Sequence, residues 1–445
     1  MKLKKKIGLV GFLVFSVLEI RGAEAEPPGL SVLSLSAALE RSVEQSMSLA
    51  KSTLDLNTAK IAADNLWAQI FPGISAGGSL GYGTSFSSPR SENEPSFGLQ
   101  ASITFSLNPG LKSSMKIITL AYQSAILNYE SSKKQLELST AKTYYGLLVE
   151  QKNLSVLKEK LSQTERQLEQ TRIRFQNGFT SELDLQRSRL AVESSRFDLS
   201  RSELLASDNL RSFLSLLDYD EKAVFALENI FSIQKIELDA EALLSRYLQS
   251  RPDMIRARQN IEKLELQRTQ KIMQSRAPSL SLSSRWSGTP SMSKPFSDSL
   301  SMSAGISIPL DSWIPASKDA QAIESAKTEL EKAKIDLKES EKNAKISIRT
   351  MVNNLSNSWR SIEIARLRVD LADRAYQMAR LGFENGSEEY LALETARNDL
   401  TTAQQQLLNE ELSYKNTSLD LAAALNISIN DLDELCAVSE KTITE

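Results

Sequence analysis

The chain has 445 residues, with 53 basic and 56 acidic side chains, a formal net charge of −3, no histidine and one cysteine. This length fits about two or three ordinary domains or one large repeated unit, and the balanced charge excludes the strong basic field expected of a nucleic-acid-binding protein. Without histidine the chain lacks the usual general base and the commonest metal ligand, and the single Cys436 excludes an internal disulfide and a multi-cysteine metal site.

The first 25 residues have the composition of a secretory signal peptide. Lysines at positions 2, 4, 5 and 6 precede a largely apolar run from Ile7 to Ile20, and Ala23-Glu-Ala25 fits a small-x-small cleavage site. A membrane anchor is the weaker interpretation, because the apolar run is shorter than the roughly 20 residues that a membrane-spanning helix needs. No later run is long enough for such a helix, so we expect an exported protein that would enter a membrane only by strands.

The following segments change from a helical to a strand pattern. Residues 36–71 predict one helix, which Pro72-Gly73 ends. Apolar residues then fall at every second position over 74–86 and again over 97–107, with small residues between them. These segments predict two strands, each with an apolar and a small polar face, a pattern that strands of soluble sandwiches share.

Two long helices follow, and their apolar residues recur every seven positions. Residues 111–175 contain one glycine and no proline, and they predict a helix on the order of 100 Å long. Its second half carries the row Leu147, Leu154, Leu161, Leu168 and Phe175, typical of a coiled-coil seam. The next helix, to residue 217, carries two such rows: Leu183, Leu190, Phe197 and Leu204, and Leu185, Val192, Leu199, Ala206 and Phe213. A two-residue offset is about 200° around a helix, so we expect a helical neighbour on each side.

After an acidic, irregular connector over 218–239, the same order of patterns repeats. The second copy predicts a helix over 240–276, strands from Leu280 and over 300–310, a long helix over 316–383 and a last helix to 425. Its two long helices carry the rows Leu355, Ile362, Val369, Tyr376 and Phe383, and Leu393, Leu400, Leu407, Tyr414 and Leu421. We therefore expect a signal peptide over 1–25, repeats over 26–217 and 240–425, the connector over 218–239 and a tail over 426–445.

Each long helix ends in the same kind of stretch. These are Phe175-Gln-Asn-Gly178 and Phe383-Glu-Asn-Gly386, with the two glycines 208 positions apart (386 − 178). Asn-Gly supplies the positive φ that ends a helix, and a Ser or Thr after it can cap the next one. Each stretch is the predicted tip of a helical hairpin, at the end opposite the strands.

The predicted strands are too few to form a membrane barrel alone. Known barrels have at least about eight strands, and lipid does not tolerate unpaired strand edges. Several copies would therefore have to pool their strands. Two copies would give about eight and three about twelve, and the pattern does not decide between these.

Over essentially its whole length after residue 25, the chain resembles the TolC-like outer-membrane efflux protein family. The resemblance rests on the duplicated order of helix, two strands, long helix, tip and helix. It rests also on local matches: Phe175-x-x-Gly178 before Leu183-Asp-Leu-Gln186, Leu381-Gly-Phe383-x-x-Gly386 before Tyr390-Leu-Ala-Leu393, and Arg251-Pro-Asp253 at the start of the second repeat.

The resemblance implies a mainly α fold with membrane β-strands. It implies a homotrimer with a long antiparallel α-helical coiled-coil barrel across the periplasm, and about twelve strands in an outer-membrane barrel. The implied function is a passive export duct of a tripartite efflux pump or a type I secretion system, with a periplasmic adaptor, an inner-membrane transporter and outer-membrane lipid as partners, and with no cofactor.

The family's gate lies at the glycine tips, where inward acidic residues narrow the aperture. The two family aspartates after the second tip fall at Ala392 and Thr395 in this sequence, and the neighbouring basic position falls at Glu388, whereas Asp184 matches an acidic position. The gate candidates are Asp184, Glu388, Glu389 and Glu394. Three copies of one acid facing inward would favour cations; alternatively, these acids only stabilise the first turns of helices.

Other residues near the tips and strands have two interpretations. Phe175, Gly178, Phe383 and Gly386 end the seams and turn the chain, and they are also the candidates for docking the adaptor. Tyr82, Phe86 and Trp286 are either aromatic residues of the lipid interface or ordinary barrel and loop aromatics.

An enzyme is the least favoured function, because the chain has no histidine, nucleophile elbow or phosphate loop. A periplasmic coiled-coil scaffold or adaptor without a pore stays open as the alternative to a channel. It explains the helices and leaves the four alternating strands unexplained.

Overall fold

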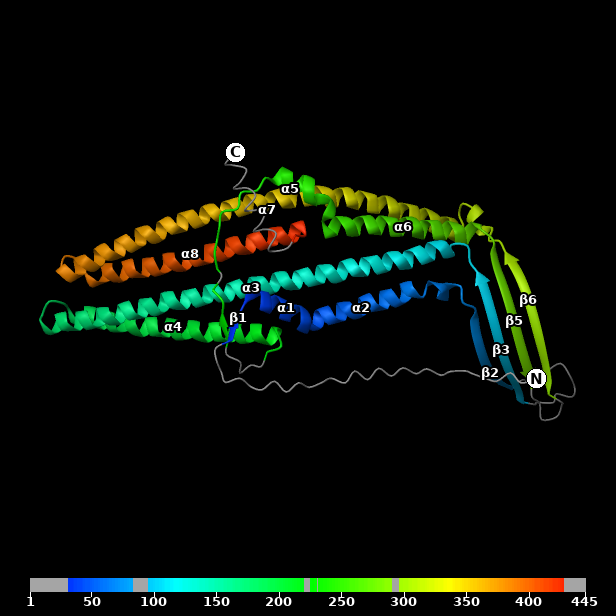
Figure 1. Ribbon diagram of the computed structural model, residues 1–445, viewed down its shortest axis with the longest axis horizontal. Coiled ribbons are helices and arrows are strands. Elements are labelled where there is room, and N and C mark those ends of the chain that lie inside the picture. Colours follow the sequence, from blue (N-terminus) through cyan, green and yellow to red (C-terminus); the bar gives the residue numbers. More distant parts are fainter. Residues whose placement is uncertain (1–30, 83–94, 220–224, 230, 290–295, 428–445) are drawn as a thin grey trace, which may run out of the picture.

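The computed structural model describes residues 31–82, 95–219, 225–229, 231–289 and 296–427. The molecule is elongated, with helical hairpins at one end and a narrow sheet at the other (Figure 1). The predicted signal peptide, Phe86 and Cys436 lie outside the described residues.

The elements occur in the same order twice. The first series is α1 (Leu35–Gln45), α2 (Met47–Asp64), β2 (Gly73–Tyr82), β3 (Pro95–Leu107), α3 (Leu111–Gln176) and α4 (Glu182–Leu216). The second is α5 (Ala240–Tyr247), α6 (Pro252–Arg276), β5 (Ser279–Thr289), β6 (Ser297–Ser307), α7 (Lys318–Asn385) and α8 (Tyr390–Leu425). Short elements join them: strands β1 (Ser31–Leu33) and β4 (Phe225–Leu227), and 3-10 turns η1 (Leu66–Gln69), η2 (Leu248–Ser250) and η3 (Asp311–Trp313).

The two long helices are continuous, with 66 residues in α3 and 68 in α7, as the sequence predicts. Near the tips the helices contact one another in the order α4, α3, α8, α7. The shorter helices follow on in line: α2 lies beside the rest of α3, and α6 lies against α3 and α7 (Figure 1). The edges of this layer are thus α4 near the tips and α2 near the sheet on one side, and α7 on the other.

Two helices predicted as continuous are broken, and each break has a local cause. The Ser46 hydroxyl accepts a bond from the Leu49 amide at 3.2 Å, so it caps α2 where α1 ends. Pro252 begins α6 and leaves Arg251 extended, as a residue before proline prefers. Arg251 also pairs with Asp253 at 2.7 Å, which fixes this start.

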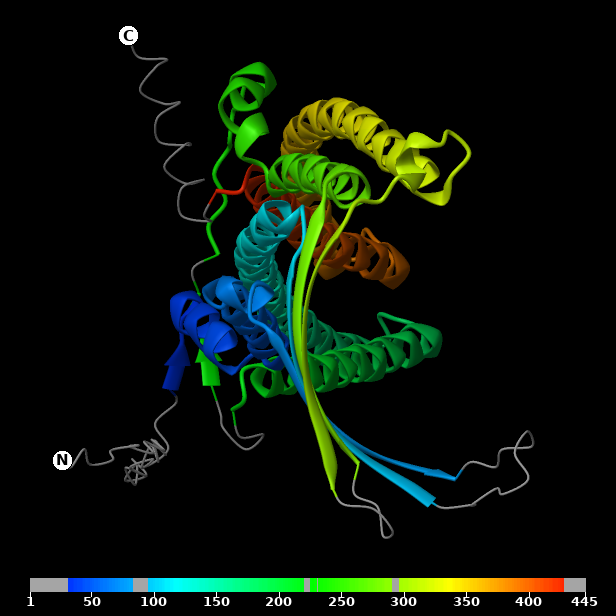
Figure 2. The same cartoon turned by 90° about the vertical axis from the view of Figure 1, so that its right-hand side faces the viewer.

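The sheet is antiparallel in the order β2-β3-β5-β6, so β2 and β6 are its edges. Its register places small polar residues on one face, where cross-strand hydroxyl pairs form: Ser75–Ser102 at 2.8 Å, Ser283–Ser303 at 2.7 Å and Ser287–Ser299 at 2.9 Å. The opposite face carries exposed apolar residues, including Ile74, Leu80, Leu300, Met302 and Ile306. Strand β6 ends at Ser307, three residues before the predicted end. Figure 2 shows the sheet running out from the helices.

The core follows the seams, although unequally. On α7 and α8 the predicted rows are largely buried, as Leu355, Ile362, Leu393 and Leu421 show. On α4 the row of Leu185 and Val192 is buried, whereas that of Leu183, Leu190, Phe197 and Leu204 is 59–70% exposed. Only one of the two neighbours predicted for α4 is therefore supplied by the same chain.

The lower half of α3 departs from the prediction. Leu147 is buried, but Leu154, Leu161 and Leu168 are only half-buried. The buried positions there include Thr164 and Thr171. Helix α3 contacts both α4 and α8, so its buried side is broader than one row.

Tyr144 of α3 bonds to two short strands that the sequence did not predict, β1 near the start of the chain and β4 after α4. Strands β1 and β4 pair in parallel, and the Tyr144 hydroxyl lies 2.9 Å from the Leu33 carbonyl oxygen and 3.0 Å from that of Glu228. Burial raises the pKa of Tyr144 to about 12. Among the described helices, none has a stretch both long and apolar enough to cross a bilayer.

Candidate functional site

The two hairpin tips lie at the end of the molecule opposite the sheet (Figure 1). At the first tip, Gly178 has φ 75°, and the Phe179 amide donates to the Arg174 carbonyl oxygen at 2.9 Å. At the second, Gly386 has φ 81°, and the Ser387 amide donates to the Gly382 carbonyl oxygen at 2.9 Å. Positive φ is costly for residues with a Cβ, so both glycines are needed for these turns.

The helices that leave the tips begin differently. Ser181 caps α4: its Oγ accepts from the Asp184 amide at 3.1 Å and donates to the Asp184 carboxylate at 2.7 Å. Asp184 is thus bonded to the Ser181 hydroxyl through both its amide and its carboxylate. Glu389 stands at the cap of α8 without a side-chain bond to the backbone there. The first turn of α8 is therefore held by fewer side-chain hydrogen bonds than the first turn of α4.

Arg174 connects the two tips. Its Nη1 donates a hydrogen bond to the carbonyl oxygen of Phe383, and its guanidinium carbon lies 4.7 Å from the centre of the Phe383 ring. Its Nη2 lies 3.3 Å from the point that a Cβ on Gly386 would occupy. One arginine of the first hairpin thus holds the backbone and the aromatic ring of the second.

The aromatic residues of the tips have different exposures. Phe383 is 4% exposed and packs edge-on against Tyr390, with ring centres 6.1 Å apart. Phe175 is 38% exposed and Phe179 is 75% exposed. Phe383 therefore supports the tip from beneath Arg174, and the exposed aromatic surface belongs to Phe175 and Phe179.

The candidate acids of the gate lie at this end but are not equivalent. Asp184 is held in the α4 cap and lies 3.8 Å from Arg187. Glu388 and Glu389 are exposed on the loop before α8, with the Glu388 side chain lying over Gly382. Glu394 is half-buried on α8. The two loop glutamates are therefore the most accessible of the four.

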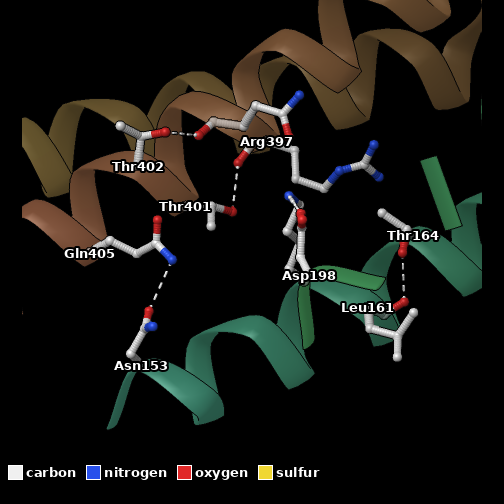
Figure 3. Close-up of polar contacts among 10 residues, drawn as sticks. Asn153, Leu161, Thr164, Asp198, Arg397, Thr401, Thr402 and Gln405 are labelled. Atoms are coloured by element: carbon white, nitrogen blue, oxygen red, sulfur yellow. Dashed lines mark hydrogen bonds and ion pairs between the residues drawn. The ribbon is translucent and has the colours of Figure 1, made fainter. Parts of the chain in front are cut away.

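Beyond the tips, polar side chains are buried between α3, α4 and α8. They comprise Thr164, Gln167, Thr171, Ser188, Ser195, Arg397 and Thr401. Arg397 is only 2% exposed, and within the described ranges no carboxylate forms an ion pair with it. Figure 3 shows its side chain extending from α8 toward the side of α3 and α4, while Asp198, also drawn there, pairs with Lys160 at 3.5 Å.

Several polar atoms of this layer lack a well-formed hydrogen bond in the described part of the chain, among them Ser188 Oγ, Tyr390 Oη and Arg397 Nε. Burial raises the pKa of Tyr390, and the nearby Ser188 and Arg397 partly oppose this shift. A buried, unpaired arginine is costly. The layer is thus a weak point in the packing just beyond the tips.

Sequence reasoning did not select Arg174 or Arg397. Arg174 lies in the last turn of α3, where basic residues are common, so its position in the sequence does not indicate a special role. Arg397 stands four residues after the buried Leu393, a helical spacing that could have indicated its burial. Within the described ranges, no cluster of acidic or cysteine side chains is arranged to hold a metal ion.

Comparisons with known proteins agree with this architecture. The model of the family described as outer membrane efflux protein matches residues 38–217 and 243–426. The chain is similar in structure to CusC, with a TM-score of 0.73 at 17% identity, covering 91% of this chain and 96% of that one.

Two further solved structures are outer membrane channels. The CmeC channel of Campylobacter jejuni has a TM-score of 0.72 at 16% identity, covering 88% of this chain and 85% of that one. The MtrE channel of Neisseria gonorrhoeae, solved in an open state, has a TM-score of 0.69 at 15% identity, covering 88% and 89%. At such identities these likenesses show a shared fold, and no curated protein sequence matches the chain significantly.

Proposed function

The chain belongs to the outer membrane efflux protein family, and we propose that three copies of it form one passive export duct through the outer membrane and the periplasm. Family membership identifies the protein as an outer-membrane efflux channel and gives no support to a scaffold without a pore. One observation supports the assembly of several copies. The helical layer has an exposed apolar row on each edge, and the sheet ends in a strand without a neighbour on each edge.

The helical layer has an exposed apolar row at each edge. On α4 the row is Leu183, Leu190, Phe197 and Leu204, and on α7 it is Ile364, Leu371 and Met378, which are 52–73% exposed. Both rows have the seven-residue spacing of a coiled-coil seam. Different surfaces that meet head to tail form a ring when the rotation between neighbouring copies closes. In the proposed ring, α4 of one copy packs against α7 of the next.

The sheet supports the same ring. Its edge strands are β2, from the first series of elements, and β6, from the second. Joining β6 of one copy to β2 of the next leaves no free edge, and three copies supply about twelve strands, above the minimum of about eight known for membrane barrels. The apolar face then meets lipid and the serine face lines the lumen.

The tips form the periplasmic end of the proposed duct. The gate acids are Asp184, Glu388, Glu389 and Glu394, with the loop glutamates the best placed to line the aperture because they are exposed. The adaptor docks on the turns at Gly178 and Gly386 and on Phe175, with Phe383 beneath them. An inner-membrane transporter supplies the energy, because the duct itself performs no catalysis.

The remaining parts of this proposal concern export and organisation. The signal peptide over 1–25 directs the chain out of the cytoplasm, and the sheet brings the protein into contact with outer-membrane lipid. Two repeats, over 26–217 and 240–425, flank the connector over 218–239, and a tail follows from 426.

Cross-linking between copies tests the ring. Cysteines replace Leu190 on α4 and Leu371 on α7 in a Cys436→Ser background, and a short bismaleimide is added to cells. Covalent dimers and trimers, with nothing larger, are expected. As a matched control, Val192→Cys replaces Leu190→Cys, because Val192 is buried within its own chain. A cross-linked series that extends beyond the trimer, or monomers alone with the exposed pair, would contradict the proposal.

A further inference from the structure

The polar face of the sheet carries a single charge among its described side chains. Strands β2 and β3 contain no charged residue, and β5 and β6 contain one each, Arg285 and Asp298. Arg285 is opposite Ser102 on β3 and Ser301 on β6, so it shares the face of the serine pairs. Asp298 is opposite Gly288, on the face of Trp286 and Leu300. The two charges therefore lie on opposite faces.

Nothing in the described part of the chain neutralises Arg285. The salt bridges there do not include it, and its side chain is exposed. Its neighbours are engaged elsewhere: Ser102 bonds with Ser75 at 2.8 Å, and Ser301 donates to the Arg285 carbonyl oxygen at 3.3 Å. Asp298 lies 3.4 Å from Trp286 Nε1. The guanidinium therefore has no ion-pair partner among the described residues, and the side chains opposite it on β3 and β6 are uncharged.

The position of Arg285 along the strand is also informative. Strand β5 leaves helix α6 at Ser279 and runs to Thr289, so Arg285 lies close to the middle of the strand, and its partner Ser102 lies close to the middle of β3. Trp286, the next residue, points to the opposite, apolar face. Arg285 would therefore point into the lumen from within the length of the barrel.

In a trimer this position is repeated around the lumen. Twelve strands spaced about 4.8 Å apart and tilted about 40° give a backbone radius of about 12 Å. Apart from Gln100, which is uncharged, the other described strand residues of this face are serine, threonine and glycine, which barely narrow such a pore. Three arginine side chains reach well into it. Rings of Arg or Lys in pores favour anions.

We propose that Arg285 forms a three-membered cationic ring inside the barrel, which binds anionic groups such as carboxylates and phosphates and favours their passage over that of cations. This site rests on the proposed trimeric channel. It is separate from the acids of the tips, which lie at the other end of the molecule.

Ion selectivity of the purified full-length protein in planar bilayers tests the proposal. Under a KCl gradient, Arg285→Ser is expected to lower the chloride-to-potassium permeability ratio at least about twofold. Arg285→Lys is expected to retain the ratio, and Ser283→Arg added to Arg285→Ser to restore it, because Ser283 lies on the same face one step closer to the helices. Inorganic phosphate is expected to block the wild-type channel more strongly than Arg285→Ser.

Two further measurements separate the possible failures. Ser283→Glu keeps Arg285 and places a carboxylate beside it, so it is expected to lower the ratio even if Arg285→Ser does not assemble. In a Cys436→Ser background, an anionic methanethiosulfonate is expected to reduce conductance when Cys replaces Arg285 but not when it replaces Leu282, on the other face. Unchanged selectivity and phosphate block in assembled Arg285→Ser channels would overturn the ring, whereas a wild-type protein without conductance would contradict the channel itself.

Discussion

Arg174 of the first hairpin tip donates a hydrogen bond to the backbone carbonyl oxygen of Phe383 at the second, and its guanidinium lies over the Phe383 ring. A cation over an aromatic face contributes about 0.5–2 kcal/mol, and a hydrogen bond from a charged donor adds to it. Because Gly178 and Gly386 end the two long helices beside this contact, Arg174 links the tips of both hairpins.

Replacement of Arg174 by alanine is expected to let the two tips separate. Spin labels at the exposed Asn177 and Asn385, in a Cys436→Ser background, report the distance between the tips by pulsed electron resonance. We expect Arg174→Ala to broaden the distribution and shift it to longer distances. Arg172→Ala is the matched control, since Arg172 is exposed and pairs only weakly with Glu169 at 3.9 Å. The same distribution in both variants would refute a coupling role for Arg174.

Tyr144 gives a prediction for alkaline pH. Burial raises its pKa from 10.0 to about 12, so the folded protein retains the proton more tightly than the unfolded chain. The contribution of the protonated Tyr144 to the free energy of unfolding is complete below about pH 10. It is lost as the pH rises through about 12, and this loss is at most about 3 kcal/mol. Chemical denaturation of Tyr144→Phe should show a smaller loss of stability between these pH values than the wild type.

The same variant has a separate effect at neutral pH. The Tyr144 hydroxyl has one proton, which it shares between the carbonyl oxygens of Leu33 and Glu228. Removing it leaves buried carbonyl oxygens without this donor and is expected to cost about 1–3 kcal/mol in the free energy of unfolding. Equal stability of Tyr144→Phe and wild type at pH 7 would show that strands β1 and β4 do not depend on this contact.

Arg397 is expected to destabilise the folded protein. Its burial without an ion pair in the described ranges predicts that Arg397→Met melts at the same temperature as wild type or higher. The exposed Arg189→Met serves as control and should change stability by less than about 0.5 kcal/mol. Thermal melts followed by circular dichroism measure both. Loss of more than about 2 kcal/mol in Arg397→Met would contradict this expectation and show that contacts of the guanidinium within the chain offset the cost of its burial.

The loop glutamates give a prediction for selectivity at the tips. If Glu388 and Glu389 line the aperture, their replacement by glutamine should lower the preference for cations, measured as a reversal potential across planar bilayers. Glu394→Gln is expected to have a smaller effect because Glu394 is half-buried. Glu384→Gln is the control, since Glu384 faces Arg380 at 3.9 Å. Unchanged reversal potentials in all three gate variants would show that these glutamates do not form a ring around the aperture.

The parts of the fold that the sequence predicts are those set by a single local pattern. Leu355, Ile362 and Phe383 repeat at sevens on α7, and all three are buried. The alternation of β3 and β6 likewise predicts the two faces of the sheet, because the side-chain period of a strand admits only two faces. The tips follow from Asn-Gly, which suits a positive φ.

The parts that it does not predict depend on which elements become neighbours. Thr164, Thr171 and Ser188 are buried because α3 has α4 on one side and α8 on the other, and no local pattern states this. The bond from Arg174 to Phe383 joins residues 209 positions apart. The break at Ser46 was missed because one serine within a helical pattern indicates a cap only weakly.

Isolation of the protein from outer-membrane fractions, followed by conductance recording in planar bilayers, tests whether it is a trimeric channel. We expect a heat-resistant trimer on denaturing gels that produces single-channel currents. A soluble periplasmic monomer without channel activity would contradict it.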